Sequence, residues 1–394
     1  MELIKDSRAK EASGPKAESS EPDLGGLSPE PDENDQLAYE QLISTELSPE
    51  QEERIRTPPQ VFPKQRSLLA AHWHPEFIPL ELIRERIDAM FPNRETELII
   101  PTQHNVLVEW DGYTGVEVDC YSSGFKRKVQ LLMHFRSERL GQAEVLKSML
   151  AHTFKYRSGQ LFEFMDSVID PGLEERVQEA AAETGATDEL ILFTRTYTTR
   201  LKKLFEANEA ITPPMAIKNK LLTEYFDHLR GQYSDRFINR AQLLLKAVKQ
   251  IVKANFSLKY FYRASEVIEE ARAVGGGVVI PHPEQFWPIL LADYDVDGYE
   301  VWNPQSREYT EFLIKVVNRN NRSLAAGDRR ILVFMGDDTH LGEKAKPPHL
   351  QKAEKAIREV GLQSAWDELD IKKSLIVANV DRNKVIQEYK ARLG

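Results

Sequence analysis

The chain has little cysteine and no long apolar run, and each absence excludes a class of protein. Its 394 residues include one cysteine, Cys120, so an intramolecular disulfide is excluded and a reducing compartment is expected. No apolar segment approaches the roughly 20 residues that a membrane-spanning helix needs. Charged and small residues follow Met1, where a secretory signal would carry its apolar core. The sequence therefore predicts a cytoplasmic protein without a membrane partner.

An excess of positive charge is also absent. The chain has 52 Lys and Arg against 62 Asp and Glu, which gives a formal net charge of -10. Because surfaces that bind nucleic acid are lined by positive charge, this balance argues against extended nucleic-acid binding. The length suffices for one large domain with an insertion, or for two domains.

Four segments differ in composition and periodicity. Residues 1–60 are rich in Glu, Asp, Ser, Pro and Gly and predict a disordered acidic tail, with a short helix over 35–43 as an option. Strand and helix patterns alternate over residues 61–135 and again over 275–394, whereas long helical patterns fill residues 136–274. Alternation on both sides of a helical stretch predicts an α/β fold, a parallel β/α barrel interrupted by an all-helical insertion.

Two histidines, His72 and His74, stand at the end of an apolar run. If residues 68–74 form a strand, the alternation of side chains directs both imidazoles to one face, where they can reach the same metal ion. An isolated pair with this spacing is common by chance, and two surface histidines near a turn are the alternative. Whether these two histidines bind a metal ion therefore depends on further candidate ligands elsewhere in the chain.

Further polar side chains fall at or near the C-terminal ends of predicted strands, where parallel β/α barrels carry their functional groups. Together with the first pair, the candidate metal ligands are His72, His74, His104, Glu117, His134, His282, Asp338 and His340. They include six of the nine histidines, which is more convergence than chance placement gives. Imidazoles mixed with carboxylates suit Zn(II), Mn(II) or Fe(II), and this many ligands implies two or three divalent ions. Such a site lowers the pKa of bound water and clamps the oxygens of a phosphoryl group.

Seven short motifs follow one another along the chain. In order, they are His72-Trp73-His74, Gln103-His104-Asn105, Gly115-Val116-Glu117-Val118, Met133-His134, Pro281-His282-Pro283-Glu284, Gly298-Tyr299-Glu300-Val301-Trp302-Asn303 and Asp338-Thr339-His340. This ordered set resembles the PHP (polymerase and histidinol phosphatase) superfamily of metal-dependent phosphoesterases, which are built on a distorted β/α barrel of seven units. The resemblance covers about residues 66–135 and 275–345 and excludes the tail and the insertion.

The resemblance implies a hydrolase that cleaves a phosphate ester with a metal-bound hydroxide. It favours a small phosphorylated substrate over nucleic acid. It also implies three ligand sets: His72, His74, Glu117 and Asp338 for one ion, Glu117, His134 and His282 for a second, and His104 and His340 for a third. Glu117 would bridge the first two ions, while Asp338 and His340 would assist proton transfer in addition to ligation.

Two positions depart from the family pattern. The family often has a further histidine in the loop after the first pair, but residues 75–79 contain none. Three alternatives stay open for the third ion: Glu76 ligates it, the site is weak, or the site is empty. Ala70 stands where the family has an Asp that would support the first histidine. Glu300 is either a group that orients a ligand or a packing residue.

Two other functions stay open from the sequence. An amidohydrolase-type metal hydrolase also begins with H-x-H in a barrel but cleaves C–N or C–O bonds. The closing pair, Asp338 and His340, favours the phosphoesterase over that type, which closes with a lone Asp. The other alternative is a non-catalytic metal-binding domain whose helical insertion recruits a partner.

Overall fold

The computed structural model describes residues 26–325 and 327–394, which divide into two compact units. Of the described residues, the helical unit contains 26–42, Phe164–Ile211 and Lys220–Val252. The α/β unit contains Ile43–Glu163, Thr212–Asn219 and Lys253–Gly394. Every predicted metal ligand lies in the α/β unit.

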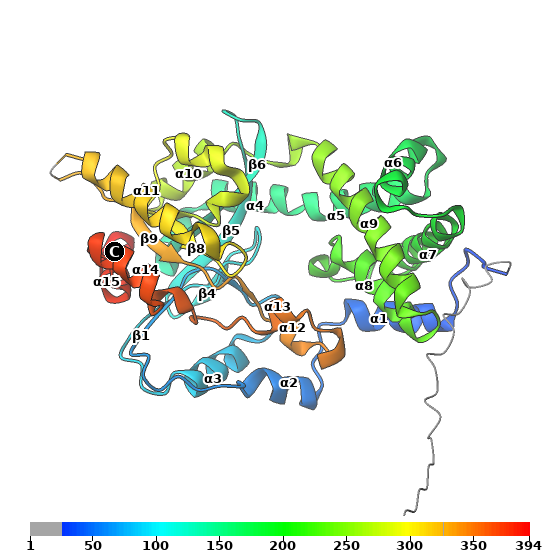
Figure 1. The fold of residues 1–394 in the computed structure, drawn as a ribbon, viewed down its shortest axis with the longest axis horizontal. Coiled ribbons are helices and arrows are strands. Elements are labelled where there is room, and N and C mark those ends of the chain that lie inside the picture. The colour runs from blue at the N-terminus through cyan, green and yellow to red at the C-terminus, as the bar shows by residue number, and fades with distance from the viewer. Residues whose placement is uncertain (1–25, 326) are drawn as a thin grey trace, which may run out of the picture. The chain divides into compact units, whose positions relative to one another are not determined.

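Helices are present along the whole described chain and are labelled in Figure 1. The α-helices are α1 Glu33–Ile43, α2 Pro49–Arg56, α3 Leu80–Met90, α4 Glu144–Phe154, α5 Tyr156–Ile169, α6 Glu174–Thr184, α7 Asp188–Ala207, α8 Lys220–His228, α9 Asp235–Asn255, α10 Ala264–Ala273, α11 Thr310–Ser323, α12 Gly342–Ala345, α13 Ala353–Ala356, α14 Leu369–Val377 and α15 Arg382–Leu393. No helix in the described ranges combines the length and the apolar character that crossing a membrane requires.

The strands all belong to the α/β unit. They are β1 Ser67–Ala70, β2 Trp73–His74, β3 Thr96–Ile99, β4 Val108–Trp110, β5 Tyr113–Ser122, β6 Arg127–Arg136, β7 Gly277–Ile280, β8 Gly298–Trp302, β9 Leu332–Met335 and β10 Thr339–His340. One sheet has the order β4-β5-β6-β7-β8-β9, and two further pairs are β1-β3 and β10-β2. Pairing is antiparallel from β4 to β7 and parallel in the other pairs.

The α/β class is confirmed, but the strands do not close into one parallel barrel. Over residues 26–325 and 327–394 the ladders leave three separate sheets. The expectation of parallel units is wrong for β5 and β6, which form an antiparallel hairpin. A parallel pair needs a crossover of a dozen or more residues, and only the short loop 123–126 joins these two strands.

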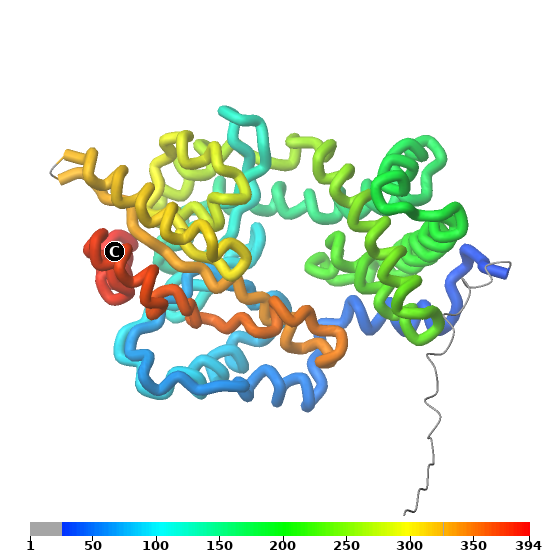
Figure 2. The backbone as a smooth tube through the Cα atoms, viewed as in Figure 1, coloured from blue at the N-terminus to red at the C-terminus, as the bar shows by residue number. Residues whose placement is uncertain are grey.

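The C-terminal helix α15 packs against two of the three sheets of the α/β unit. It contacts β1 and β3 on one side and β6, β7 and β9 of the large sheet. The chain ends directly after it (Figure 2). Tyr389 of α15 is fully buried and packs edge-on against Phe334 of β9, with ring centroids 4.9 Å apart. The strands of the large sheet pack with α15 in one hydrophobic cluster, whereas Trp73 of β2 and Leu341 after β10 belong to a second cluster.

The helical unit includes part of the segment that was predicted as a tail. Asp35 of α1 is buried and accepts hydrogen bonds from Arg200 Nη1 at 2.9 Å and from the Tyr225 hydroxyl at 2.6 Å. The expected disorder therefore does not extend to α1, nor to α2, and residues 1–25 of the predicted tail lie outside the described residues. The segment predicted as a helical insertion, 136–274, contains α4 to α10, and its residues are divided between the two units.

Candidate metal centre

The first and last motifs meet in one short parallel pair. β2 and β10 pair with His74 opposite His340. The backbone continues this pairing on both sides, because the N–H of Asp338 donates to the carbonyl of His72 at 2.9 Å and the N–H of Leu341 to that of His74 at 3.0 Å. Asp338 has a φ of 47°, a left-handed conformation that aspartate adopts more readily than most residues. Two segments far apart in the chain thus present their polar side chains together.

A second backbone contact brings in His104 and Glu117. The two residues form a parallel bridge, and the N–H of Asn105 donates to the carbonyl of Glu117 at 2.7 Å. The side chains also meet, with Glu117 Oε2 2.6 Å from His104 Nδ1. His282 follows β7 with a φ of 28° and places its Nε2 atom 3.7 Å from Glu117 Oε1. Glu117 is therefore a carboxylate shared by histidines from different strands.

Several spacings in this cluster match the distances between atoms that ligate one divalent ion. For four tetrahedral ligands at about 2.1 Å, two ligand atoms lie about 3.4 Å apart. Asp338 Oδ1 lies 3.4 Å from His340 Nε2, 3.5 Å from His74 Nε2 and 3.7 Å from His72 Nε2. Glu117 Oε2 lies 3.6 Å from His74 Nε2. These gaps are long for hydrogen bonds and leave room for an ion between the atoms.

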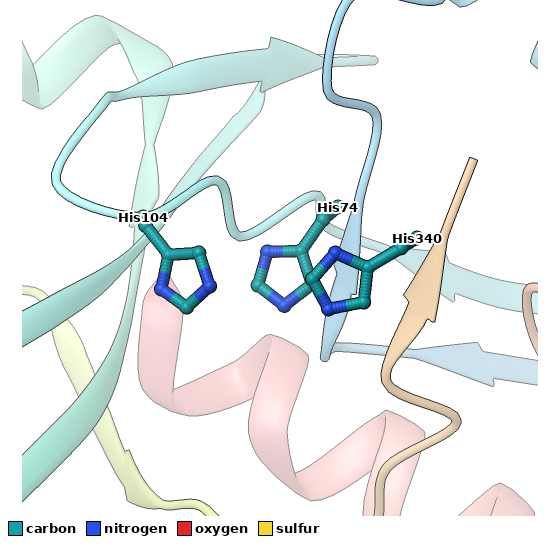
Figure 3. A group of neighbouring side chains, drawn as sticks. All are labelled: His74, His104 and His340. Atoms are coloured by element: carbon teal, nitrogen blue, oxygen red, sulfur yellow. The ribbon is translucent and has the colours of Figure 1, made fainter. Parts of the chain in front are cut away.

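Seven of the eight predicted ligands meet in three overlapping groups. Their ligand atoms lie within 4.8 Å of one another, and the groups are His72, Glu117 and His282; His72, His74 and Asp338; and His74, His104 and His340. Figure 3 shows the last of these, named here the three-histidine group. Its His74 ring lies nearly parallel to both others, with centroids 4.6 Å from His104 and 4.3 Å from His340. Because His72 and His74 each belong to two groups, neighbouring ions would share ligands.

The cluster is buried except at the three-histidine group. His72, His74 and Glu117 are at most 2% exposed, whereas the side chains of His104 and His340 are 23% and 20% exposed. Among the described residues, His72 Nε2 and both ring nitrogens of His74 have no hydrogen-bond partner. Leaving a buried polar atom unpaired costs about 1–3 kcal/mol, and a metal ion satisfies such a nitrogen by accepting its lone pair. The donor set therefore fits divalent ions.

Glu300 contacts His72 at Nδ1, the ring nitrogen that points away from the other candidate ligands. Its Oε2 atom lies 2.6 Å from His72 Nδ1, and its Oε1 atom accepts a hydrogen bond from Asn303 Nδ2 at 2.8 Å. A Cβ atom at Gly336 would lie 2.4 Å from the Glu300 carboxylate, so this position has room only for glycine. Of the two roles that the sequence left open for Glu300, the geometry favours the one that orients a ligand.

Protonation in the cluster follows from burial and neighbouring charge. Burial alone would lower the pKa of His72, but Glu300 and further carboxylates raise it to about 10. Burial, together with two neighbouring histidines, lowers the pKa of His74 to about 3. Burial would raise the pKa values of Glu117 and Asp338, yet the surrounding histidines hold both well below the usual range. Both carboxylates are therefore ionised, as metal ligands must be.

The structure does not bring His134 into the cluster. Its Nε2–H donates to the carbonyl of Ala71 at 3.0 Å, and its Nδ1 accepts from the Tyr389 hydroxyl at 2.7 Å. Burial lowers the pKa of His134 to about 4, so the ring is neutral and both nitrogens are occupied. The antiparallel course of β6 explains this position, because it pairs His134 with Gly277, at the N-terminal end of β7, whereas His282 follows the C-terminal end.

Other polar groups at the site were not marked by any motif. Arg358 Nη1 donates to Asp338 Oδ2 at 2.9 Å, and Gln305 Nε2 donates to the same oxygen at 2.7 Å. These contacts leave Oδ1 to face the histidines. Glu76 Oε1 lies 3.6 Å from His340 Nδ1, which is consistent with the alternative that Glu76 supports the third ion. Only Glu76 could be found from the sequence, because it follows the H-x-H motif closely.

Comparisons with known proteins find a likeness among solved structures. A scan against protein-family models finds no match, and a search of curated proteins finds none. Among solved structures, the chain is similar to a "putative metal-dependent phosphoesterase" from Bifidobacterium adolescentis, with 18% sequence identity and a TM-score of 0.39. The match covers 82% of this chain and 98% of that chain. A likeness at this level does not establish a common fold or activity.

Proposed function

We propose that the chain is a metal-dependent phosphoesterase of the PHP type, which hydrolyses a phosphate ester at a site for two or three divalent ions. The observation that carries the proposal is the convergence of seven predicted ligands into three groups that share His72 and His74. The order of the sequence motifs supports it as well. On this proposal the three sheets together correspond to an opened form of the seven-unit barrel.

The ligand chemistry favours Mn(II), Zn(II) or Fe(II), since the groups combine imidazole nitrogens with carboxylate oxygens. When bound, such ions supply Lewis acidity toward phosphoryl oxygens and a water of lowered pKa. Glu117 holds negative charge between His74, His104 and His282, at 2.6 to 3.7 Å from their nitrogens. His340 has Nε2 3.4 Å from Asp338 Oδ1 and lies at the exposed side of the site. On this proposal, the pair exchanges a proton with the leaving oxygen.

Hydrolysis of an aryl phosphate with added Mn(II) tests the proposal. We expect turnover by the wild-type protein and a fall of about 100-fold or more in His74→Ala and in Asp338→Asn. His74 belongs to two of the groups, and Asp338 Oδ1 lies 3.4 to 3.7 Å from three of the histidines. His152→Ala is the matched control, since His152 is exposed on α4 and lies outside the groups. Equal rates in all variants would contradict the proposal. Cleavage of an aryl amide without cleavage of the phosphate would favour the amidohydrolase type, and bound metal without turnover would favour a binding role.

A further inference from the structure

A buried arginine outside the ligand motifs stands at the start of α5, and the residue before it is joined by side-chain contacts to the loop that carries His104. Arg157 stands in the first turn of α5 and is 8% exposed. In the described part of the chain its Nη1 atom has no hydrogen-bond partner. A buried cationic nitrogen without a partner is costly, and an anionic ligand removes that cost.

Hydrogen bonds fix the start of α5 against the loop that carries His104. Lys128 Nζ lies 3.1 Å from the Tyr156 hydroxyl and 2.5 Å from Asp119 Oδ1. The other oxygen of Asp119 accepts from Asn105 Nδ2 at 2.7 Å, and Asn105 directly follows His104. A continuous set of contacts therefore joins the first turn of α5, which carries the arginine, to the histidine loop.

A second cation reaches the other end of the three-histidine group. Lys218 lies in the segment Thr212–Asn219, which belongs to the α/β unit. Its Nζ atom is 3.3 Å from Glu76 Oε1, and the same oxygen lies 3.6 Å from His340 Nδ1. The lysine therefore stands at the His340 end of the group, and the turn of α5 that carries the arginine is joined to the His104 end.

The two cations are also connected to each other through α5. Asn219, the residue after Lys218, donates to Gln160 Oε1 at 2.5 Å. Gln160 lies three residues after Arg157, and residues three apart share one face of a helix. The face of α5 that carries the arginine is thus the face that meets the lysine segment. The ring centroids of His104 and His340, between the two cations, are 6.2 Å apart.

We propose that Arg157 and Lys218 bind the non-bridging oxygens of a phosphomonoester over the three-histidine group, an assignment that rests on the proposed phosphoesterase function. The planar guanidinium matches two phosphate oxygens at once, and the lysine contributes a point charge.

Access to the site supports the same substrate class. The exposed side chains of the cluster are those of His104 and His340, while the other ligand groups are at most 10% exposed. A terminal phosphoryl group can enter over this pair with its one substituent directed to solvent. The internal phosphate of a diester carries two substituents, and both would need space beside the buried ligands.

Binding of inorganic phosphate to the Mn(II)-loaded protein, measured by calorimetry, tests the assignment. We expect Arg157→Gln to weaken binding about 10- to 100-fold, as loss of a charge-assisted pair does, and Arg157→Lys to weaken it less. Arg127→Gln is the matched control, because Arg127 is an exposed arginine on β6 and should leave binding unchanged. Metal content and melting temperature are measured for each variant, and Arg157→Lys serves alone if Arg157→Gln does not fold. Unchanged phosphate affinity in a folded, metal-loaded Arg157 variant would overturn the assignment.

A pair of model esters tests the substrate class. With phenyl phosphate and diphenyl phosphate, we expect kcat/KM to favour the monoester by at least about tenfold, and KM for the monoester to rise in the Arg157 variants. Equal use of both esters would overturn the monoester assignment. Phosphate binding that depends on Arg157, in a protein that hydrolyses neither ester, would support the anion site and count against the phosphoesterase function alone.

Discussion

Glu300 Oε2 lies 2.6 Å from His72 Nδ1, although 228 residues separate the two in the chain. With Nδ1–H donating to Glu300, the Nε2 atom of His72 is directed toward Asp338 and Glu117, at 3.7 and 4.0 Å. A carboxylate behind a ligating imidazole fixes the ring and increases its basicity. Glu300 therefore acts on the metal through His72 and is a positioning residue.

Removing the Glu300 charge is expected to weaken metal binding without removing a ligand. We expect Glu300→Gln to lower the affinity for Mn(II) about 10- to 100-fold, measured by competition with a chelator. Gly336→Ala should act in the same direction, because its Cβ would lie 2.4 Å from the Glu300 carboxylate. Glu308→Gln, an exposed glutamate in the short helix Arg307–Tyr309, is the control. Wild-type affinity in Glu300→Gln would contradict the positioning role.

Metal affinity is expected to rise with pH. In the metal-free protein, burial opposes the charge on His72 but Glu300 prevails, and the pKa is raised to about 10. Near neutral pH an ion must therefore displace the proton on Nε2, so each unit of pH gained below 10 strengthens apparent binding by up to about tenfold. Calorimetry in buffers of different ionisation enthalpy should show at least about one proton released per chain. Affinity that stays flat or falls between pH 6 and 9 would contradict this expectation.

His134 and His282 are expected to behave differently when replaced. His134→Gln should lower the free energy of unfolding by about 1–3 kcal/mol, because it breaks buried hydrogen bonds to Ala71 and Tyr389, yet keep the bound metal. His282→Gln should lower the metal content, since His282 shares a group with Glu117. Denaturant unfolding combined with elemental analysis measures both effects. A stable His134→Gln protein that has lost an ion would restore the prediction made from the sequence.

Sequence motifs marked seven residues that lie together in the structure, whereas the directions of the strands were predicted poorly. Each short motif could be recognised from a few neighbouring residues alone. The pairing of β2 with β10 brings two of these motifs together, with His74 opposite His340. The direction of β6 was not readable from its alternation, because a strand pattern is the same in either direction. The signal that was available is the loop 123–126, with Ser123 and Gly124 between two strand patterns, which is typical of a hairpin.

Other parts of the site had no local signal. Arg157, Lys218 and Arg358 lie in segments without a motif, and only the packing of those segments brings them to the ligands. Glu300 could be assigned to a strand from its neighbours, but its contact with His72 depends on where two distant strands meet. The short helix that was an option over 35–43 is present as α1, Glu33–Ile43, but its burial could not be predicted locally because its partners lie in distant helices.

The buried contacts of α1 predict a stability effect in the helical unit. We expect Asp35→Ala to lower the free energy of unfolding by about 3 kcal/mol, because it leaves Arg200 buried without its carboxylate partner and removes the acceptor of the Tyr225 hydroxyl. Glu33→Ala, an exposed change in the same helix, should have little effect. Denaturant unfolding of both variants measures the difference. Equal stability would show that α1 contributes nothing to the helical unit.

Elemental analysis of the purified protein tests the central claim most directly. We expect two or three equivalents of Mn, Zn or Fe per chain, and a clear loss in His74→Ala, because His74 belongs to two of the three ligand groups. The exposed-histidine variant His152→Ala should keep its metal. A wild-type protein that carries no metal and takes up none from Mn(II), Zn(II) or Fe(II) would contradict the account.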